Sequence, residues 1–159
     1  MFVTGGSSGI GADIVIAYAR QGAKVGFTGR NAEAAAKVVE AASALGPTPL
    51  FLQSDAADVA ALKSAIATTA ERFGDIGVLV NNVANDQRHN LADVTQEDFD
   101  WRVAINLRPA FFAAQSVVEG MKRLGGGAIV NLGSISWMIK GAGYPCLLYT
   151  SDAADERSS

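Results

Sequence analysis

The chain has little of what secreted, membrane-spanning and metal-binding proteins depend on. Its 159 residues contain one cysteine, Cys146, so no disulfide can form within the chain. Its one histidine, His89, has no partner set, and we predict no metal site. No apolar run reaches the roughly 20 residues that a membrane span requires, and the N-terminus does not have the form of a signal peptide. These absences predict a cytoplasmic protein with no membrane partner.

Basic charge is also scarce. The chain has 13 Lys and Arg against 16 Asp and Glu, a net charge of −3, and its basic residues form no run. Nucleic acids attract proteins with basic patches, so we expect no nucleic-acid partner. The length suits a single domain, and a hydrophobic content of 49% is enough for a core.

What the chain does have is a glycine-rich segment, Thr4 to Gly11, between a β-branched run and an amphipathic helix. Gly5 would permit the tight turn, Gly9 a close approach to a pyrophosphate, and Gly11 the packing of the helix on the sheet. The helix N-terminus would then face the anion. We therefore predict a dinucleotide-binding loop, against the alternative of an ordinary strand-to-helix turn. Its predicted cofactor contacts are Gly5, Ser7, Ser8, Gly9, Ile10 and Gly11.

Hydrophobic periodicity predicts strands alternating with helices along the rest of the chain. After a short first strand at residues 1–3, strands are expected at residues 24–28, 49–53, 78–80 and 128–132. The first helix is predicted from the spacing of Ile10, Ile14, Ala17 and Tyr18. Asn31 and Asp58 are expected helix N-caps, and a helix from Thr95 to about Leu124 should be kinked near Pro109. Strands that are apolar on both faces indicate an α/β fold with a parallel sheet covered on both sides.

These motifs, in this order, resemble the short-chain dehydrogenase/reductase family over roughly residues 2–145. Asn81-Asn82-Val83-Ala84 stands where the family has Asn-Asn-Ala-Gly, and Gly133-Ser134 follows the fifth strand. The resemblance implies a Rossmann-like, doubly wound parallel sheet, here incomplete with about five strands, and hydride transfer with a nicotinamide cofactor. It assigns Asn106 to holding a water in a proton relay and Ser134 to the reacting carbonyl or hydroxyl. Further cofactor contacts implied are Asp55, at the adenine ring, Ala56, Asn82, Val83 and Ala84.

The choice of cofactor can be argued from the end of the second strand. It reads Thr28-Gly29-Arg30, without an acid. An acid there would accept hydrogen bonds from the ribose 2′-hydroxyl, whereas an arginine accommodates a 2′-phosphate. The planar donors of Arg30 therefore favour NADP, with NAD possible. The alternative is a solvated arginine at the start of a surface helix.

The chain departs from the family near its end. The family's chemistry needs Tyr-x-x-x-Lys, which its spacing from Ser134 would put at positions 147 and 151, where Leu147 and Ser151 stand. The segment from Cys146 resembles a translated sequencing adapter. We therefore divide the chain into a NAD(P)-binding Rossmann domain fragment, residues 1–145, and an artefactual, disordered tail, residues 146–159. We expect this fragment to be inactive, with the fifth strand an open edge.

The segments around Asn85 and Ser134 most resemble aldose dehydrogenases of the xylose, fucose and arabinose type, which oxidise the anomeric hydroxyl to a lactone. Asn85 and Trp137 would contact the sugar, Trp137 as an aromatic platform. The expected partners are a small-molecule sugar and, for the parent protein, further copies of itself. The alternative enzyme is a 3-oxoacyl or other carbonyl reductase, which would share every cofactor residue with an aldose dehydrogenase. The alternative that is not an enzyme is a non-catalytic nucleotide-binding fragment.

Overall fold

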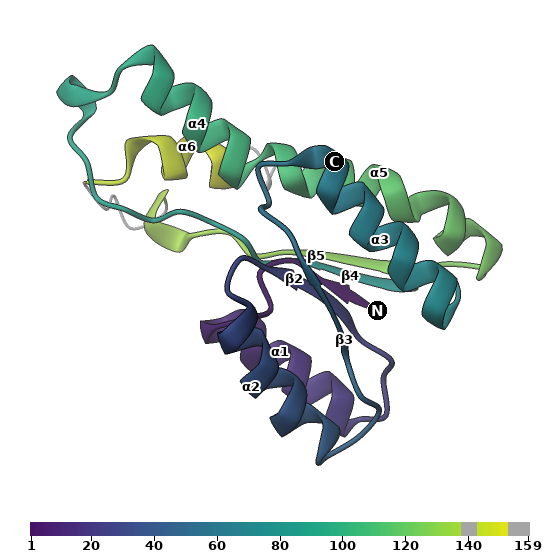
Figure 1. Cartoon of the computed structure of the whole chain (residues 1–159). Coiled ribbons are helices and arrows are strands. Elements are labelled where there is room, and N and C mark those ends of the chain that lie inside the picture. Colours follow the sequence, from purple (N-terminus) through teal and green to yellow (C-terminus); the bar gives the residue numbers. More distant parts are fainter. Residues whose placement is uncertain (138–142, 153–159) are drawn as a thin grey trace.

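The computed structural model describes residues 1–137 and 143–152. It contains one five-stranded parallel sheet with the order β3-β2-β1-β4-β5 (Figure 1). The strands are β1 (Phe2–Val3), β2 (Gly26–Gly29), β3 (Leu50–Gln53), β4 (Val78–Asn81) and β5 (Ala128–Asn131). The strand order reverses at β1, since β2 and β3 extend to one side of it and β4 and β5 to the other. The predicted doubly wound parallel sheet is therefore confirmed.

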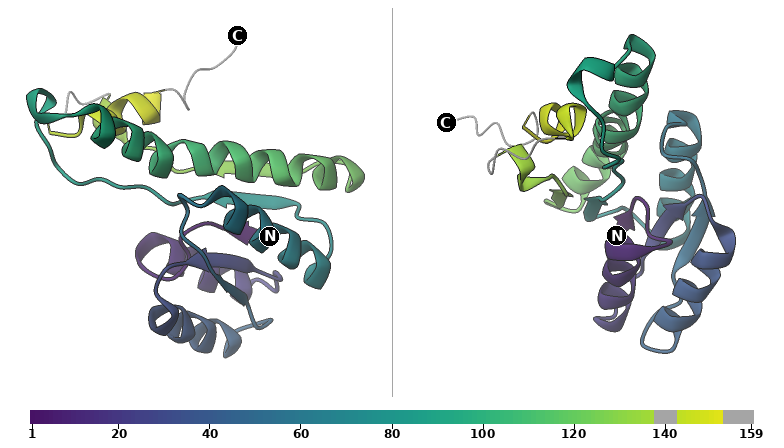
Figure 2. Two further views of the ribbon diagram at one scale, coloured as in Figure 1. Left: turned by 45° about the horizontal axis from the view of Figure 1, so that its top comes forward. Right: turned by 90° about the vertical axis from the view of Figure 1, so that its left-hand side faces the viewer.

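Helices cover both faces of the sheet (Figures 1 and 2). One face carries α1 (Gly9–Arg20) and α2 (Ala32–Ser43), and the other carries α3 (Val59–Phe73) and α5 (Arg108–Arg123). The remaining helices, α4 (Gln96–Asn106) and α6 (Pro145–Asp152), pack against each other at the end of the molecule toward which β4 and β5 run (Figure 1). Single 3₁₀ turns stand at Leu91–Asp93 and Ile135–Trp137. None of the helices in the described ranges could span a membrane.

The central strand β1 has only two residues, and it contributes one side chain to the core on each face of the sheet. Phe2 and Val3 are both fully buried, and neighbouring side chains of a strand point to opposite faces. Phe2 packs in the cluster that includes Leu62 and Leu79, on the side of α3 and α5. Val3 packs in the cluster that includes Val15, on the side of α1 and α2. The sheet is therefore buried on both sides at β1, as parallel sheets require.

The buried face of α1 differs from the predicted one. Ile10 is 68% exposed, while Gly11, Val15 and Ala19 are buried. A Cβ atom on Gly11 would collide with the carbonyl oxygen of Gly5, so the helix approaches the preceding loop most closely at Gly11. This contact rotates the buried face by one residue, and Ile10 is left at the rim of the site.

The predicted helix from Thr95 to Leu124 is two helices. α4 ends at Asn106, Leu107 has φ −117° and ψ −50°, and α5 starts at Arg108. Pro109 stands in the first turn of α5, where its missing N–H breaks no helical hydrogen bond. The predicted kink is thus confirmed as a complete break between two helices that continue nearly in line (Figure 2).

Side-chain caps begin three helices. The side-chain oxygens of Asn31, Asp58 and Thr95 accept hydrogen bonds from the amides three residues later, at 2.9, 3.0 and 3.2 Å. Each cap satisfies one of the backbone donors that a helix N-terminus leaves without an intrahelical partner. The caps predicted at Asn31 and Asp58 are therefore confirmed.

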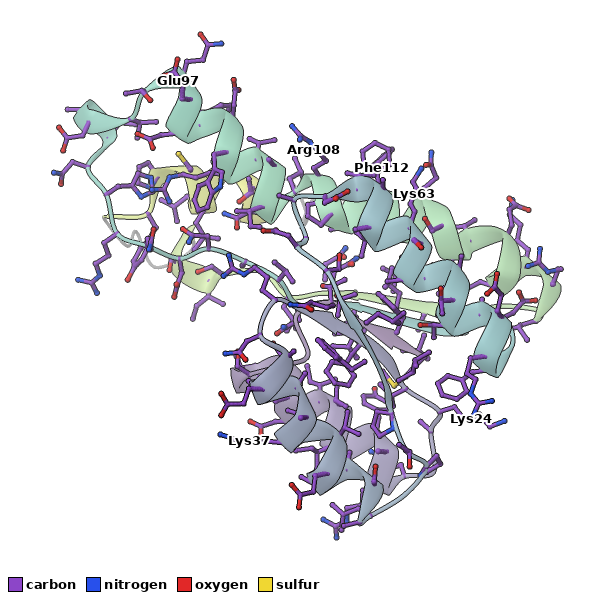
Figure 3. All side chains as sticks on the ribbon, viewed as in Figure 1. Lys24, Lys37, Lys63, Glu97, Arg108 and Phe112 are labelled. Atoms are coloured by element: carbon purple, nitrogen blue, oxygen red, sulfur yellow. The ribbon has the colours of Figure 1, made fainter. Side chains whose placement is uncertain are left out.

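Polar contacts join α3 and its following loop to α5. Lys63 Nζ lies 4.9 Å from the centroid of the Phe112 ring and donates to Gln115 Oε1 at 3.0 Å; Figure 3 shows Lys63 and Phe112 on these two helices. At the other end of α5, Arg123 binds both carboxylate oxygens of Asp75, at 2.9 and 2.6 Å. The hydrogen bond from Arg123 holds the pKa of the Asp75 carboxyl below its ordinary value.

The segment predicted to be a disordered tail, residues 146–159, starts inside a helix, because residues 145–152 form α6. Cys146 and Leu147 are only 4% and 9% exposed, and the hydroxyl of Thr150 bonds to the carbonyls of both residues. The apolar start of this segment packs against α4, which offsets the entropy of ordering it. Residues 153–159 lie outside the described part of the structure.

The prediction for the sheet edge is confirmed. Within the described residues β5 pairs with β4 alone, and Ile129 and Val130 are 39% and 42% exposed. The sheet therefore ends in a strand with accessible apolar side chains.

Candidate functional site

Two loops far apart in the sequence are fixed to each other at the carboxyl edge of the sheet. Gly5 has φ +69°, which favours glycine, and a Cβ there would come within 2.7 Å of the Val83 side chain. Thr4 Oγ1 accepts from the amides of Asn82 and Val83 at 3.0 and 3.3 Å. Asn82 Nδ2 donates to the carbonyls of Thr4 and Gly5 at 3.0 and 3.1 Å. Asn82 thus holds the glycine-rich loop in place.

The N-terminus of α1 is suited to an anion. Ser8, the N-cap residue, forms no side-chain cap, and the first turn of the helix contains no acidic residue. The first amides of a helix lack intrahelical acceptors and carry the positive end of its dipole. A pyrophosphate placed here would receive these hydrogen bonds.

A cavity of about 250 Å³, here called the β2–β4 cavity, extends from this loop across the carboxyl ends of β2, β3 and β4. Most of the predicted cofactor contacts line it: Gly5, Ser7, Ser8, Arg30, Asp55, Ala56, Asn82, Val83 and Ala84. The remaining lining residues are Thr28, Gly29, Ser54, Asn85, Trp101 and Ile105. Segments from the two halves of the sheet therefore meet in one cavity at the topological switch point, where ligands bind in folds of this kind.

Arg30 is the basic side chain of this cavity. Its carbonyl accepts a hydrogen bond from Gln53 Nε2 at 3.0 Å, which ties the end of β2 to the end of β3. Its side chain is exposed and forms no ion pair within residues 1–137 and 143–152. Asp55, by contrast, uses Oδ1 to accept from the amide of Ala57 at 2.9 Å. The guanidinium is therefore a charged group open to a ligand at this wall.

A second cavity, of about 550 Å³ and here called the Ser134 cavity, adjoins the first and shares Ser8, Asn82 and Ala84 with it. The predicted residues Gly9, Ile10, Gly11 and Ser134 line it, together with Asp86 and Leu147. The hydroxyl of Ser134 donates to Ser136 Oγ at 2.8 Å and accepts from the Ser136 amide at 3.2 Å.

Position 147, where the resemblance puts a tyrosine, lies in the same cavity as Ser134. Leu147 has no group that can donate or accept a proton. The side chain that position 147 contributes to this cavity therefore cannot perform acid–base chemistry.

Asn106 and Arg102, one turn apart on α4, both hold Asn85. Asn106 Oδ1 accepts from the Asn85 amide at 2.6 Å, and Asn106 Nδ2 donates to the Asn85 carbonyl at 3.2 Å. Arg102 Nη1 donates to Asn85 Oδ1 at 3.2 Å and to the Gln87 carbonyl at 3.5 Å. Helix α4 thereby fixes both the backbone and the side chain of Asn85.

The predicted site residues Asn85, Ser134 and Asn106 line three cavities that share Ala84. Asn85 lines the β2–β4 cavity, whereas its neighbour Asp86 lines the Ser134 cavity. Asn106 lines a third cavity, of about 340 Å³, which shares Ala84 with both of the others. The side chain of Trp137 lies outside the described part of the structure, so its predicted contact with a sugar stays a prediction.

Sequence reasoning missed Trp101, Arg102 and Ile105. All three stand on α4, and the i, i+4 spacing of Trp101 and Ile105 indicates one face of a helix. That spacing could have indicated that Trp101 and Ile105 share one helix face, but it does not reveal whether that face packs on the core or lines a cavity.

Comparison with known proteins places this geometry in a family. The sequence model of the short chain dehydrogenase family matches residues 1–150 of this chain. The chain is 44% identical over 140 residues to a probable galactose dehydrogenase of Rhizobium meliloti, and 46% identical over 136 residues to a D-xylose 1-dehydrogenase of Caulobacter vibrioides. These alignments cover 87% and 85% of this chain but only 55% and 53% of the two proteins.

A solved short-chain dehydrogenase/reductase from Serratia marcescens has a similar structure. The TM-score is 0.89 at 34% identity, over 96% of this chain and 62% of that one. The chain thus spans somewhat more than half the length of the relatives it matches. On the strength of the family match, the sheet topology and the glycine-rich loop, this chain belongs to the short-chain dehydrogenase family.

Proposed function

We propose that residues 1–145 come from an NADP-dependent aldose dehydrogenase that oxidises the anomeric hydroxyl of a sugar to a lactone. The observation that carries the proposal is the β2–β4 cavity, which joins a helix N-terminus suited to a pyrophosphate with an exposed arginine at the end of β2. The sugar dehydrogenases of Rhizobium and Caulobacter support the class of substrate.

A nicotinamide cofactor would supply the hydride acceptor, and the residues present fit such a group. The amides at the start of α1 would bind its pyrophosphate, Arg30 a 2′-phosphate, and Asp55 and Ala56 its adenine end. Asn82, Val83 and Ala84 would lie against the cofactor. The absence of an acid at the end of β2 favours NADP, and NAD remains the second choice.

Ser134 would hold the anomeric hydroxyl by a hydrogen bond, and Asn106 would hold a water in the path of the departing proton. Asn85 and Trp137 would contact the sugar.

Neither Leu147 nor Ser151 can take the roles of the family's tyrosine and lysine. We therefore propose that the chain as it stands does not catalyse hydride transfer, that its sequence from Cys146 is artefactual, and that its parent is a cytoplasmic homo-oligomer.

Leu147 in the Ser134 cavity favours a second candidate for the chain itself, a non-catalytic nucleotide-binding fragment. For the parent protein, the alternative is a carbonyl reductase acting on a 3-oxoacyl or other ketone substrate, because such an enzyme would use the same cofactor residues.

The protein continued past Pro145, as its source DNA encodes it, would test the proposal. We expect it to oxidise a pentose or deoxyhexose faster than it reduces a model acyl thioester, with the lactone as product. Trp137→Ala should raise KM more than it lowers kcat if stacking on the sugar is equal in the ground and transition states. Activity confined to the thioester would favour the carbonyl reductase.

A further inference from the structure

One wall of the β2–β4 cavity is apolar and comes from α4. Trp101 and Ile105 stand one helical turn apart, and both line the cavity together with polar residues that follow β2 and β3. The indole of Trp101 is 45% exposed. A large aromatic side chain that stays half in contact with water at a cavity wall can gain considerable contact area when a flat ligand covers it.

A buried charge lies over the indole ring. The guanidinium carbon of Arg102 lies 5.8 Å from the Trp101 ring. Arg102 is only 8% exposed and is held by Asn85 Oδ1 and the Gln87 carbonyl. Because Arg102 cannot move freely, it restricts the orientation of the indole beside it, and a pre-oriented ring costs less entropy to bind against.

The chemistry of the cavity changes along its length. Donor groups for phosphates lie at Ser7, Ser8 and Arg30, and the apolar wall lies at Trp101 and Ile105. A ligand that satisfies both ends carries phosphates and a flat aromatic base. Asp55 and Ala56 line the same cavity as Arg30, and the proposed function assigns the adenosine half of the cofactor to these residues.

We propose that Trp101 is the contact that determines affinity for the adenine base, with its indole stacked on the face of the base. The inference rests on the proposed nucleotide site and deepens it, since it assigns the base to a wall contributed by α4. Phe99 provides a matched control, because it stands on the same helix, is also 45% exposed, and does not line the cavity.

The test is calorimetric titration of the chain with adenosine 2′,5′-bisphosphate. Trp101→Ala should raise Kd about 10-fold, the scale of loss seen when one aromatic–base stack is removed. Trp101→Phe should retain most of the affinity, and Phe99→Ala should change Kd by less than about twofold, as expected for an exposed side chain outside the site. Circular dichroism would verify that each variant folds.

A second measurement needs no change at Trp101. The chain has two tryptophans, so Trp137→Phe leaves Trp101 as the single indole, and the nucleotide should quench its emission. The nucleotide could bind without quenching this emission, and Trp101→Ala could bind it as tightly as the unmodified chain. These two results together would overturn the stacking but not the proposed cofactor site. No nucleotide binding by the unmodified chain would overturn the proposed cofactor site and the role of Trp101 with it.

Discussion

Two arginines at the site show how burial decides what a guanidinium does. Arg30 is exposed at the end of β2, without an ion pair in the described part of the chain. Arg102 is buried, bonds Asn85 and Gln87 with one nitrogen, and leaves its Nε without a hydrogen bond. An exposed guanidinium can exchange water for a ligand, whereas a buried one is committed to the groups around it. Arg30 is thus suited to recognition and Arg102 to positioning.

At the residue scale, Arg30→Asp should reverse the cofactor preference. The substitution removes the donors for a 2′-phosphate and adds an acceptor for a ribose hydroxyl. We expect Kd for NADP to rise about 10- to 100-fold, the equivalent of one or two charge-assisted hydrogen bonds, while Kd for NAD rises less or falls.

Calorimetry with both dinucleotides checks this without requiring turnover. Lys24→Asp makes the same charge change at an exposed position that precedes β2 and does not line the cavity; Figure 3 labels Lys24. It should leave both constants nearly unchanged. Equal or tighter binding of NAD by the unmodified chain would show that Arg30 does not select the cofactor.

At the element scale, β5 behaves as an unprotected edge. Each of its four residues is exposed, and in the part of the chain that the structure describes it pairs, in parallel, with β4 only. Unpaired backbone groups next to apolar side chains can add a strand from another molecule. Neither a proline nor a charged residue within β5 opposes this.

Val130→Lys should therefore reduce self-association of the chain, because it puts a charge at the open edge. The free energy of unfolding should change by only about 0.5 kcal/mol, since Val130 is already 42% exposed. Light scattering over a concentration series measures association. Val118→Lys, on α5, is the matched control; an equal fall in scattering for both variants would mean that net charge, rather than the β5 edge, is responsible.

At the scale of the whole molecule, the site exists because the two halves of the sheet and α6 converge. Asn82 reaches back to Thr4 across 78 positions of sequence, and Leu147 reaches the same cavity as Ser134. Helix α6 thus brings an aliphatic side chain into the cavity that Ser134 lines.

The unmodified chain should therefore show no appreciable hydride transfer, whereas Leu147→Tyr with Ser151→Lys should raise the rate. General acid–base catalysis typically contributes about 10²- to 10⁴-fold, which sets the scale of the gain. The assay follows absorbance of the reduced cofactor with an aldose and NADP. Leu147→Phe with Ser151→Lys differs only by the hydroxyl and should stay inactive. Equal rates for the Tyr and Phe variants, or robust turnover by the unmodified chain, would refute the expectation.

Local signals account for what was predictable from the sequence. The order of strands and helices, the caps at Asn31 and Asp58 and the break near Pro109 depend on residues only a few positions apart. The face of α1 was predicted one residue out of phase because its packing depends on how closely Gly11 approaches Gly5. The helical state of residues 145–152 was missed because it depends on packing against α4.

By itself, the sequence determined the class of fold, the family and most of the cofactor-contact candidates, because glycine positions, capping residues and apolar runs are local restrictions on the backbone. Only the tertiary structure decided that Trp101 and Ile105 form a cavity wall, that Asn106 and Arg102 both hold Asn85, and that position 147 lies beside Ser134 in one cavity. Such placements depend on contacts between separate elements, and the spacing of residues along one helix cannot distinguish a neighbouring core from an open site.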